Sequence, residues 1–570
     1  MDLGRLAEAP DLDDRREHIE RRQVRKLCGK WHVIDVTYDV KGQSSLLWVS
    51  SLRQNVTVTR LGFLLDSDNC IGCHACTVAC KSEHDVPLGV NRTWVKYIET
   101  GTFPDVARKF NVMRCNQCDD APCMTICPTS ALFRADNGVV DFQDDDCIGC
   151  KSCMNACPYD ALYINPETNT AHKCNMCNHR LEQDLEPSCQ IVCPTEAIII
   201  GDLDDPTSKI SQMISRNDVA VRAPEQNTKP KVYYKGADQA ALDPTRTAIA
   251  NDGMIWADTT PDHPSVPVTL GKKPTDVEGV VARTTYTTGH KTTWGQMVSG
   301  YLVTKAIAGG AMLIAALQVL LGHADEQSSV GLMAPIVAAI FLAITGGLLV
   351  GDLKQPGRFY YLLTKGNFSS WLVKGAYVLM IFGTITLVWF IAGIVEAETL
   401  LQWLAVPAAI AGAATAGYTA FLFAQCEGRD LWQTPLLLPM LLARAVVAGA
   451  SAWLIADLFI DVPSPDAVRW ALVGGVIAVL VLSWMEAAGS HSRHVEIAVH
   501  NMVSGEFGSL FWGGLALGAI VPLILGIVAL SISSASAAVT ISALGALFAL
   551  IGMFLSETAF VHAGQSVPLS

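Results

Sequence analysis

The stretch CIGCHACTVAC runs from Cys70 to Cys80, and the stretch CIGCKSCMNACP runs from Cys147 to Pro158. Both follow the spacing C-x2-C-x2-C-x3-C, which puts three thiolates on one tight loop and a fourth on the helical turn behind it. Three thiolates on one loop can bind three irons of a cubane, whereas the fourth points away and binds the neighbouring cluster of a pair. The two stretches therefore predict a domain built around paired iron–sulfur clusters.

Two looser cysteine runs complete the set. They read C-x2-C-x4-C-x3-C-P and C-x2-C-x11-C-x3-C-P, and consist of Cys115, Cys118, Cys123 and Cys127, and of Cys174, Cys177, Cys189 and Cys193. The four runs use 16 of the 18 cysteines and leave Cys28 and Cys426, for which we expect free thiols. Four runs of four ligands predict four clusters.

Other uses of these cysteines fit the spacing less well. Disulfides do not require a repeated spacing, and structural zinc sites do not use a third and a fourth cysteine in this arrangement. The segment Cys70–His74 also matches the C-x-x-C-H signature of covalent haem attachment. Its cysteines are already needed by the cluster run, so we do not expect attached haem.

The 570-residue chain divides into two unlike halves. Before about residue 293 the sequence is polar, acidic and rich in cysteine, and after it long apolar runs follow with almost no cysteine. The mean hydropathy of +0.31, in a chain with 17% charged residues, averages these halves. The net charge of −13 lies mainly in the first half and argues against a nucleic-acid partner.

The apolar half contains eight runs that are long enough to cross a bilayer as helices. Their glycine and alanine content suits close helix packing. The predicted spans are residues 297–321, 331–351, 371–394, 401–424, 434–458, 467–487, 510–531 and 536–556.

The predicted fold is an α+β soluble domain with two bacterial-type ferredoxin folds, followed by an all-α membrane bundle. We expect an N-terminal extension at 1–57, a four-cluster domain at 58–202, an extended linker at 203–293 and a membrane domain at 294–570. Strands are expected near Trp31–Val40 and Val56–Leu65, the second of which would open the cluster domain. The linker is rich in Asp, Thr, Pro and Lys, and we expect it to lie along the cluster domain or a partner subunit.

The loop charges predict an orientation for the bundle. The loops on the side of the cluster domain carry Lys291, Lys354, Arg358, Lys365, Lys374, Arg429 and Arg493. The opposite loops hold mainly Arg469 with Asp325, Glu326, Glu396, Glu398 and Asp461. The positive-inside rule then puts the cluster domain and both termini in the cytoplasm. The pairs Arg15–Arg16 and Arg21–Arg22 lack the apolar core of a twin-arginine export signal, which agrees with this side.

Histidines indicate which cofactor the membrane half can hold. A haem b needs histidines inside the helices, whereas those of this half fall in loops or at helix ends: His323, His491, His494, His500 and His562. We therefore expect no haem and another two-electron acceptor.

With these motifs in place, residues 58–202 resemble the four-cluster electron-transfer subunits of the molybdopterin oxidoreductase superfamily, such as those of dimethyl sulfoxide reductase and polysulfide reductase. The resemblance rests on Cys70–Cys73, Ala79–Lys81, the segment from Gly101 to Pro104 and the Cys-Pro endings of the runs. It implies cross-pairing of the first run with the fourth and of the second with the third. Some relatives replace one ligand and hold a three-iron cluster, but all sixteen cysteines are kept here, which predicts four [4Fe–4S] clusters.

The ligand sets implied by this resemblance are four quartets. The first quartet is Cys70, Cys73, Cys76 and Cys193, and the fourth quartet is Cys80, Cys174, Cys177 and Cys189. The second quartet is Cys115, Cys118, Cys123 and Cys157, and the third quartet is Cys127, Cys147, Cys150 and Cys153.

The membrane half is similar to the NrfD and polysulfide reductase membrane-subunit family, which exchanges electrons with quinone without haem. The matching residues are Tyr301 with Ala308-Gly309-Gly310, Asp352–Phe359, Tyr418-Thr419, Trp432 to Pro435, and Ala563-Gly564-Gln565 with Pro568. In that family quinone sits between early helices near the cluster domain, which implies contacts from Tyr301 and Tyr418. Tyr301 stands where a relative has histidine, and an interfacial or packing role for either tyrosine stays open.

Charged groups within the predicted helices are candidates for function, because they are costly in a bilayer. Lys305 lies one turn from Tyr301, so the two side chains can share one face and contact quinone. Asp352, Arg444, Glu486 and Glu557 could form a proton path. For Asp352 and Glu486 a local ion pair or a helix-end position is the alternative.

Together these features predict an electron-transfer and membrane-anchor subunit of a respiratory oxidoreductase. Electrons would pass through four [4Fe–4S] clusters between a molybdopterin-dependent catalytic partner and the membrane quinone pool, menaquinone or ubiquinone. Quinone reduction or quinol oxidation would occur in this chain, and the substrate chemistry would belong to the partner. Two alternatives stay open: a proton-translocating module resembling alternative complex III, and a bundle that only tethers the cluster domain.

Overall fold

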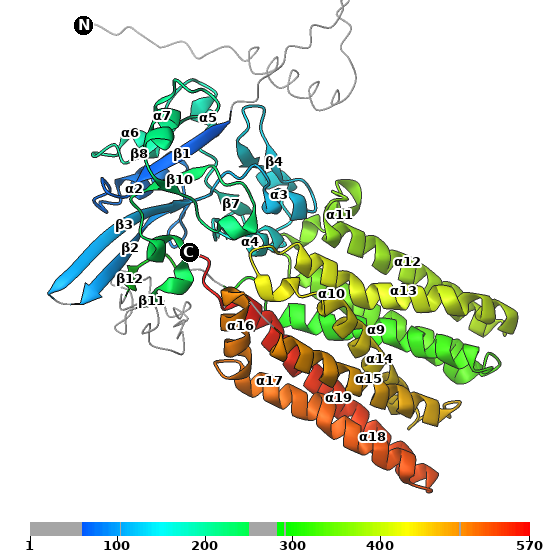
Figure 1. Cartoon of the computed structure of the whole chain (residues 1–570). Coiled ribbons are helices and arrows are strands. Elements are labelled where there is room, and N and C mark those ends of the chain that lie inside the picture. Colours follow the sequence, from blue (N-terminus) through cyan, green and yellow to red (C-terminus); the bar gives the residue numbers. More distant parts are fainter. Residues whose placement is uncertain (1–59, 103, 250–281, 290–291, 490–491) are drawn as a thin grey trace, which may run out of the picture. The chain divides into compact units, whose positions relative to one another are not determined.

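A computed structural model describes residues 60–102, 104–249, 282–289, 292–489 and 492–570. The predictions for the N-terminal extension, for Cys28, for Lys291 and for His491 lie outside the described residues. Figure 1 shows strands and short helices in the first half of the chain and long helices in the second. The α+β and all-α halves predicted from the sequence are thus confirmed.

The first sheet has the strand order β8-β1-β10-β9. Its strands are β8 (Ile198–Asp202), β1 (Leu61–Asp66), β10 (Val232–Lys235) and β9 (Val219–Ala220). Strand β1 is buried along most of its length and leads directly to the first cysteine run. It pairs antiparallel with β8 and parallel with β10, so chain segments far apart in sequence meet beside the first and fourth cysteine runs.

The second sheet has the order β11-β12-β2-β3. Its strands are β11 (Ala248–Ile249), β12 (Ala282–Tyr286), β2 (Thr93–Thr102) and β3 (Asp105–Arg114). The β2–β3 hairpin turns near Gly101, whose φ is +89° and where an added Cβ would lie 2.1 Å from the Asp105 carbonyl oxygen. A side chain is excluded there, and β3 then delivers Arg114 directly before Cys115.

The segment predicted as an extended linker is structured where it is described. It contributes α7 (Lys209–Arg216), α8 (Gln239–Leu242) and strands β9 to β12. Strand β10 is part of the first sheet of the cluster domain, and β12 is part of the second. These strands are only two to five residues long, too short for a periodic pattern to be visible. Pairing fixes their conformation rather than local sequence: β10 pairs with β1 and β12 with β2, and β9 and β11 pair with β10 and β12.

Small elements hold the cysteine runs. Two hairpins, β4 (Leu132–Arg134) with β5 (Val140–Phe142) and β6 (Leu162–Ile164) with β7 (Ala171–Lys173), follow the second and third runs. The short helices within or beside the runs are α2 (Ala75–Glu83), α3 (Pro122–Ile126), α4 (Ser152–Ala156), α5 (Asn178–Leu181) and α6 (Ser188–Ile191).

The second half contains eight apolar helical spans among its described residues, which confirms the predicted number. They are α9 (Gln296–Leu320), η4 with α10 (Gln327–Gly351), α12 (Trp371–Ile394), α13 (Glu398–Ala424), α14 (Leu437–Ala456), α15 (Pro465–Ala488), α17 to α18 (Gly508–Ser531) and α19 (Ala535–Gln565). The last helix continues nine residues past its predicted end, because its charged Glu557 is paired inside the bundle. An additional short helix, α16 (Arg493–Val503), was not predicted.

Helix α9 is the central element of the bundle, with 83% of its apolar window buried. It packs closely on α13 and α14 through facing glycines. A Cβ on Gly309 would lie 2.5 Å from the Gly412 carbonyl oxygen, and one on Gly449 would lie 2.2 Å from Gly310. The small residues predicted to favour close packing therefore hold α9 against both neighbours.

Candidate functional site

The four cysteine runs share one backbone feature. The residue before the second cysteine of each run has a positive φ: Gly72 (69°), Gln117 (49°), Gly149 (67°) and Met176 (58°). This left-handed residue turns the chain so that successive cysteines lie on the inside of one tight loop. In the second and third runs the fourth cysteine is the C-cap of a five-residue helix, which carries its thiol away from the loop.

The thiols of the first and fourth runs come together across the chain. Burial, and then the thiols of Cys193 and Cys73, raise the pKa of Cys70, against an opposing hydrogen bond from the Gly72 amide. Cys76 interacts with both Cys70 and Cys189. The structure thus brings together the four side chains of the predicted first quartet.

The predicted fourth quartet is gathered in the same way. Burial and the neighbouring thiols of Cys174, Cys189 and Cys177 raise the pKa of Cys80. Because Cys76 also interacts with Cys189, the first and fourth quartets are neighbours. We call these two quartets the outer pair.

We call the second and third quartets the inner pair. The thiols of the second quartet lie around Cys123. Burial and the thiols of Cys157, Cys115 and Cys118 raise the pKa of Cys123, and all four residues line one cavity.

The third quartet is gathered around Cys153. Burial and the thiols of Cys150, Cys147 and Cys127 raise the pKa of Cys153, and Cys123 of the second quartet acts on it too. The thiols within each predicted quartet therefore interact with one another, and the quartets are neighbours in two pairs.

These sets fit cubane clusters better than separate thiols. Each predicted set combines three cysteines of one run with one from another run, as the chemistry of paired clusters requires. Backbone amides already point at the sulfur atoms: Gly149 and Ala171 each donate to Cys147 Sγ at 3.4 Å, and Ala197 donates to Cys193 Sγ at 3.2 Å. Such hydrogen bonds are among the protein's means of setting a cluster's potential.

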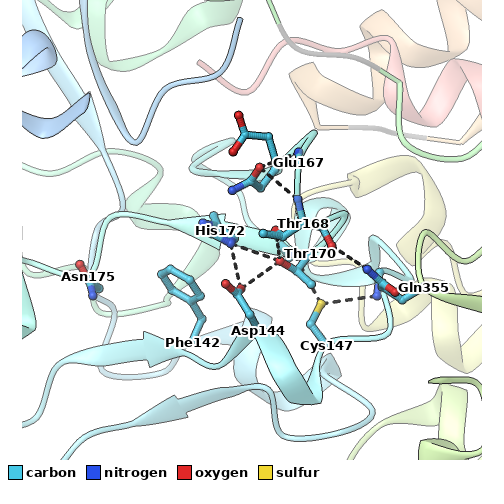
Figure 2. Close-up of polar contacts among 12 residues, drawn as sticks. Phe142, Asp144, Cys147, Glu167, Thr168, Thr170, His172, Asn175 and Gln355 are labelled. Atoms are coloured by element: carbon cyan, nitrogen blue, oxygen red, sulfur yellow. Dashed lines mark hydrogen bonds and ion pairs between the residues drawn. The ribbon is translucent and has the colours of Figure 1, made fainter. Parts of the chain in front are cut away.

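The segment Asp352–Phe359, which follows the second span, is hydrogen-bonded to the third cysteine run. Lys354 donates its backbone N–H to the Gly149 carbonyl at 3.1 Å, and Gln355 donates its own to Ile148 at 3.2 Å. The Gln355 side chain reaches the Thr168 carbonyl at 2.6 Å (Figure 2). The backbone of this segment therefore contacts the loop that carries the inner thiols.

Two charged side chains of the segment add contacts to the cluster domain. Arg358 donates to the carbonyls of Asp144 at 2.6 Å and Cys147 at 3.0 Å. Asp352 accepts from Lys151 at 2.8 Å in an ion pair whose side chains are 20% and 8% exposed. The local ion pair that the sequence left as an alternative for Asp352 is the contact observed, so this residue connects the halves.

Trp294, just before α9, connects the third cysteine run to the bundle. Its indole N–H donates to the Cys150 carbonyl at 3.2 Å, and its ring stacks on Phe423 and Trp432 with centroids 5.7 and 5.4 Å apart. The side chain of Gln565 accepts from the Trp294 amide at 3.0 Å and donates to its carbonyl at 2.7 Å. The last helix therefore fixes the start of the first.

The predicted quinone residues meet in the interior of the bundle. Tyr301 and Tyr418 are 4% and 5% exposed, and Lys305 is fully buried. The Lys305 ammonium lies 4.8 Å from the centroid of the Tyr418 ring and 5.7 Å from that of Tyr301. Its hydrogen-bond partner is the hydroxyl of Thr419. Two phenols, a hydroxyl and an ammonium thus converge two turns along α9 from Trp294.

The remaining predicted proton residues form two groups. Arg444 and Glu557 make an ion pair at 2.6 Å, and the Glu557 Oε2 atom has no hydrogen-bond partner among the described residues. Glu486 accepts from Thr434 at 2.7 Å. A cavity of about 70 Å³ separates Arg444 from Glu486, and α14, α15, α17 and α19 line it.

The described histidines of the membrane half lie at its edges. His323 is in the loop after α9, where its ring bonds the Ser464 hydroxyl at 2.7 Å. His494 and His500 lie on α16, and His562 lies near the end of α19.

Comparison with known proteins assigns both halves. The family described as "Polysulphide reductase, NrfD" matches residues 285–568, and the families of the 4Fe–4S dicluster domain and the 4Fe–4S binding domain match residues 106–203 and 61–82. The iron–sulfur subunit ArrB of the arsenate respiratory reductase of Shewanella sp. (strain ANA-3) is 36% identical, over 31% of this chain and 95% of the relative. The chain therefore belongs to the family of iron–sulfur subunits that includes ArrB, and here such a subunit is fused to an NrfD membrane domain.

Two further relatives agree with this membership. A subunit of the tetrathionate reductase of Salmonella typhimurium is 42% identical over 32% of this chain and 76% of its own length. A polypeptide of the polysulfide reductase of Wolinella succinogenes is 40% identical over 30% of this chain and 93% of its own length. The fusion is therefore an iron–sulfur electron-transfer protein with a multi-pass membrane domain, and both resemblances drawn from the sequence are confirmed.

Sequence reasoning missed several residues that shape the site. Arg114, Lys151 and Trp294 are distant in sequence from the groups they contact, and Gln565 was noted only as part of a family ending. Arg114 and Lys151 lie beside ligand cysteines, which is the one local signal that could have singled them out.

Proposed function

We propose that this chain holds four [4Fe–4S] clusters and carries electrons between a molybdopterin-dependent catalytic subunit and quinone. The observation that carries the proposal is continuity. The backbone carbonyl of Cys150, in the third cysteine run, accepts a hydrogen bond from Trp294 just before α9, and Tyr301 and Lys305 lie on that helix. The first quartet includes the exposed Cys73, which supports an entry point for a partner at the other end.

The quinone end is proposed to be the Tyr301, Lys305 and Tyr418 group. Burial of an ammonium group is costly unless a partner offsets it, and the hydrogen-bond partner of Lys305 is a single neutral hydroxyl. A quinone carbonyl would accept a hydrogen bond from this ammonium or from a phenol. Reduction of the quinone to quinol would take up two electrons from the clusters and two protons, for which the Lys305 ammonium and the two phenols are the proposed donors.

The quinone proposal is tested by reducing the clusters with a quinol. In the purified full-length chain, quinol addition should bleach the cluster absorbance. K305M and Y418F should slow this bleaching by about tenfold, the scale of one lost charged hydrogen bond, with unchanged iron content. W453F is the control, because Trp453 is buried in α14 and bonds Ala311 instead. Unchanged rates in both site variants would reduce the bundle to a tether.

The cluster domain and both ends of the chain are proposed to lie in the cytoplasm. Support comes from the basic residues of the loops that join the cluster domain, of which Arg358, Lys365 and Arg493 contact it directly. Cysteine-accessibility labelling of A535C, on the opposite loop side, and of S570C tests this. Labelling of A535C from the cytoplasm would contradict it.

The partner is proposed to be a catalytic subunit carrying a molybdopterin. This rests on the likeness of the first half to subunits of arsenate, tetrathionate and polysulfide reductases. Isolation of the native complex and metal analysis of its largest subunit test it, and a large subunit without molybdenum or tungsten would contradict it.

A second candidate function is proton translocation coupled to this electron transfer. It is supported by the cavity between Arg444 and Glu486, which is large enough for several waters and has polar side chains at both ends. Glu557 pairs with Arg444, which lines this cavity, and also acts electrostatically on Lys305. Sealed vesicles that reduce quinone without acidifying or alkalinising the medium beyond quinone chemistry would exclude it.

A further inference from the structure

Arg114 is a buried cation that faces thiols. It closes β3 and is fully buried, and its guanidinium donates to Cys189 Sγ at 3.4 Å. The guanidinium also lies over the Phe63 ring, 4.2 Å from its centroid. Among residues that the structure describes, no carboxylate oxygen comes within 4.0 Å of it.

The guanidinium of Arg114 lies among thiols of the outer pair. It donates to Cys189 Sγ and interacts electrostatically with Cys174 and Cys76. Cys76 belongs to the first quartet, and Cys174 and Cys189 belong to the fourth. The guanidinium therefore lies between the two quartets of the outer pair.

Two donors of this guanidinium are not used by the protein. The Nε and Nη2 atoms of Arg114 are buried, and neither has a hydrogen-bond partner in the described part of the chain. A buried donor without an acceptor is costly, and a buried charge even more so. Sulfur atoms of clusters held by the two quartets would supply both the acceptors and the negative charge.

We propose that Arg114 donates hydrogen bonds to the sulfur atoms of the outer pair of clusters and raises their reduction potentials. A reduced cluster carries one more negative charge than an oxidised one. A fixed cation and its hydrogen bonds therefore stabilise the reduced form more. Arg114 acts here as a tuning residue for electron transfer and takes no part in chemistry at the quinone. The inference rests on the proposed four-cluster function.

Lys96 provides a matched control within the same sheet. It lies on β2, is 1% exposed, and its ammonium also has no hydrogen-bond partner among the described residues. Its electrostatic neighbours are Arg222 and Asp243 instead of thiols. Replacing Lys96 removes a buried amine that does not face thiols.

The test is a redox titration of the full-length chain followed by electron paramagnetic resonance, with iron and sulfide counted in each variant. In R114M the ratio of reduced to oxidised form at a fixed potential should fall about tenfold for two of the four clusters. For a one-electron couple this corresponds to a reduction potential lowered by about 59 mV. R114K keeps the charge but loses the planar fork, so its shift should be smaller. K96M should shift neither cluster.

Each result decides the inference. Unchanged potentials in R114M with full iron content would overturn it, and so would an equal shift in K96M. If R114M loses iron, R114K decides: a shift with iron retained supports the inference, whereas no shift, or iron loss in R114K as well, overturns it. A wild-type chain with fewer than four clusters would instead contradict the proposed function.

Discussion

Cys73 of the outer pair is exposed, whereas Cys153 of the inner pair is buried and its loop is bonded to the membrane helices. Around the outer pair, large apolar side chains such as Ile71 and Ile191 also remain exposed. Equivalent cysteine spacing thus occurs in two different surroundings. Among the described residues, one end of the domain is exposed, and the other is bonded to segments of the bundle.

The largest effect is expected when one thiol is removed from each end of the domain. C150S should eliminate the third cluster and stop reduction of the remaining clusters by quinol, a loss of about 100-fold or more on the scale of losing an essential step. C73S should remove the first cluster but leave quinol reduction of the other three intact. Iron counting and stopped-flow bleaching measure both. Equal quinol rates in the two variants would contradict the assignment of inner and outer ends.

A smaller effect is expected from the ion pair that fastens the inner end. In K151M the carboxylate of Asp352 stays partly buried without its partner, which should destabilise the joint by up to about 3 kcal/mol. Quinol reduction should fall while iron content is kept. K209M is the control, because Lys209 and Glu196 form an exposed pair near the outer end and contribute little. A thermal melt in which both variants lose the same stability would argue against a special joint.

The outer pair should show its own pH dependence through Glu83. The hydroxyl of Ser188, and then His179 and Arg180, lower the pKa of Glu83 to about 2. A carboxyl group normally titrates near about 4.3, so the stabilisation is complete above that pH and is lost as the pH falls toward about 2. The difference in thermal midpoint between wild type and E83Q should therefore shrink as the pH is lowered from 5 to 3. A difference that stays constant would show that the charge of Glu83 is not involved.

The smallest effect is expected at the bridge itself. W294F keeps most of the stacking on Phe423 but removes the hydrogen bond to the Cys150 carbonyl. Loss of one such bond corresponds to about 1 kcal/mol, so quinol reduction should slow by only a few-fold. W294A, which also removes the ring, should slow it further. A W294F variant as slow as W294A would mean that the hydrogen bond, and not the packing, determines the contact.

The sequence predicted most where the physics is local. Cysteine spacing depends on one loop and one helical turn, and each apolar run is compared only with the thickness of a bilayer, so neither prediction needs a folded partner segment. The last span was predicted too short because Glu557 reads as a helix end until Arg444 is seen to pair with it. The linker was predicted without structure because β10 and β12 are defined by the strands they join.

Three basic residues of the loops beside the cluster domain do more than set its side of the membrane. Arg358, Lys365 and Arg493 read from the sequence as topological charges. In the structure they also bind carbonyls or carboxylates of the cluster domain. The positive charge of these residues therefore also serves to bind the cluster domain, which only the contacts between the two halves of the chain reveal.

By itself, the sequence determined that sixteen thiols are available in four runs and that eight helices can span a membrane. The tertiary structure decided which thiols stand together, which cation faces them and which helix begins at the inner cluster loop. The reason is distance along the chain: Arg114 and Cys189, or Cys150 and Trp294, are brought together by sheet pairing and helix packing. No local pattern encodes those contacts.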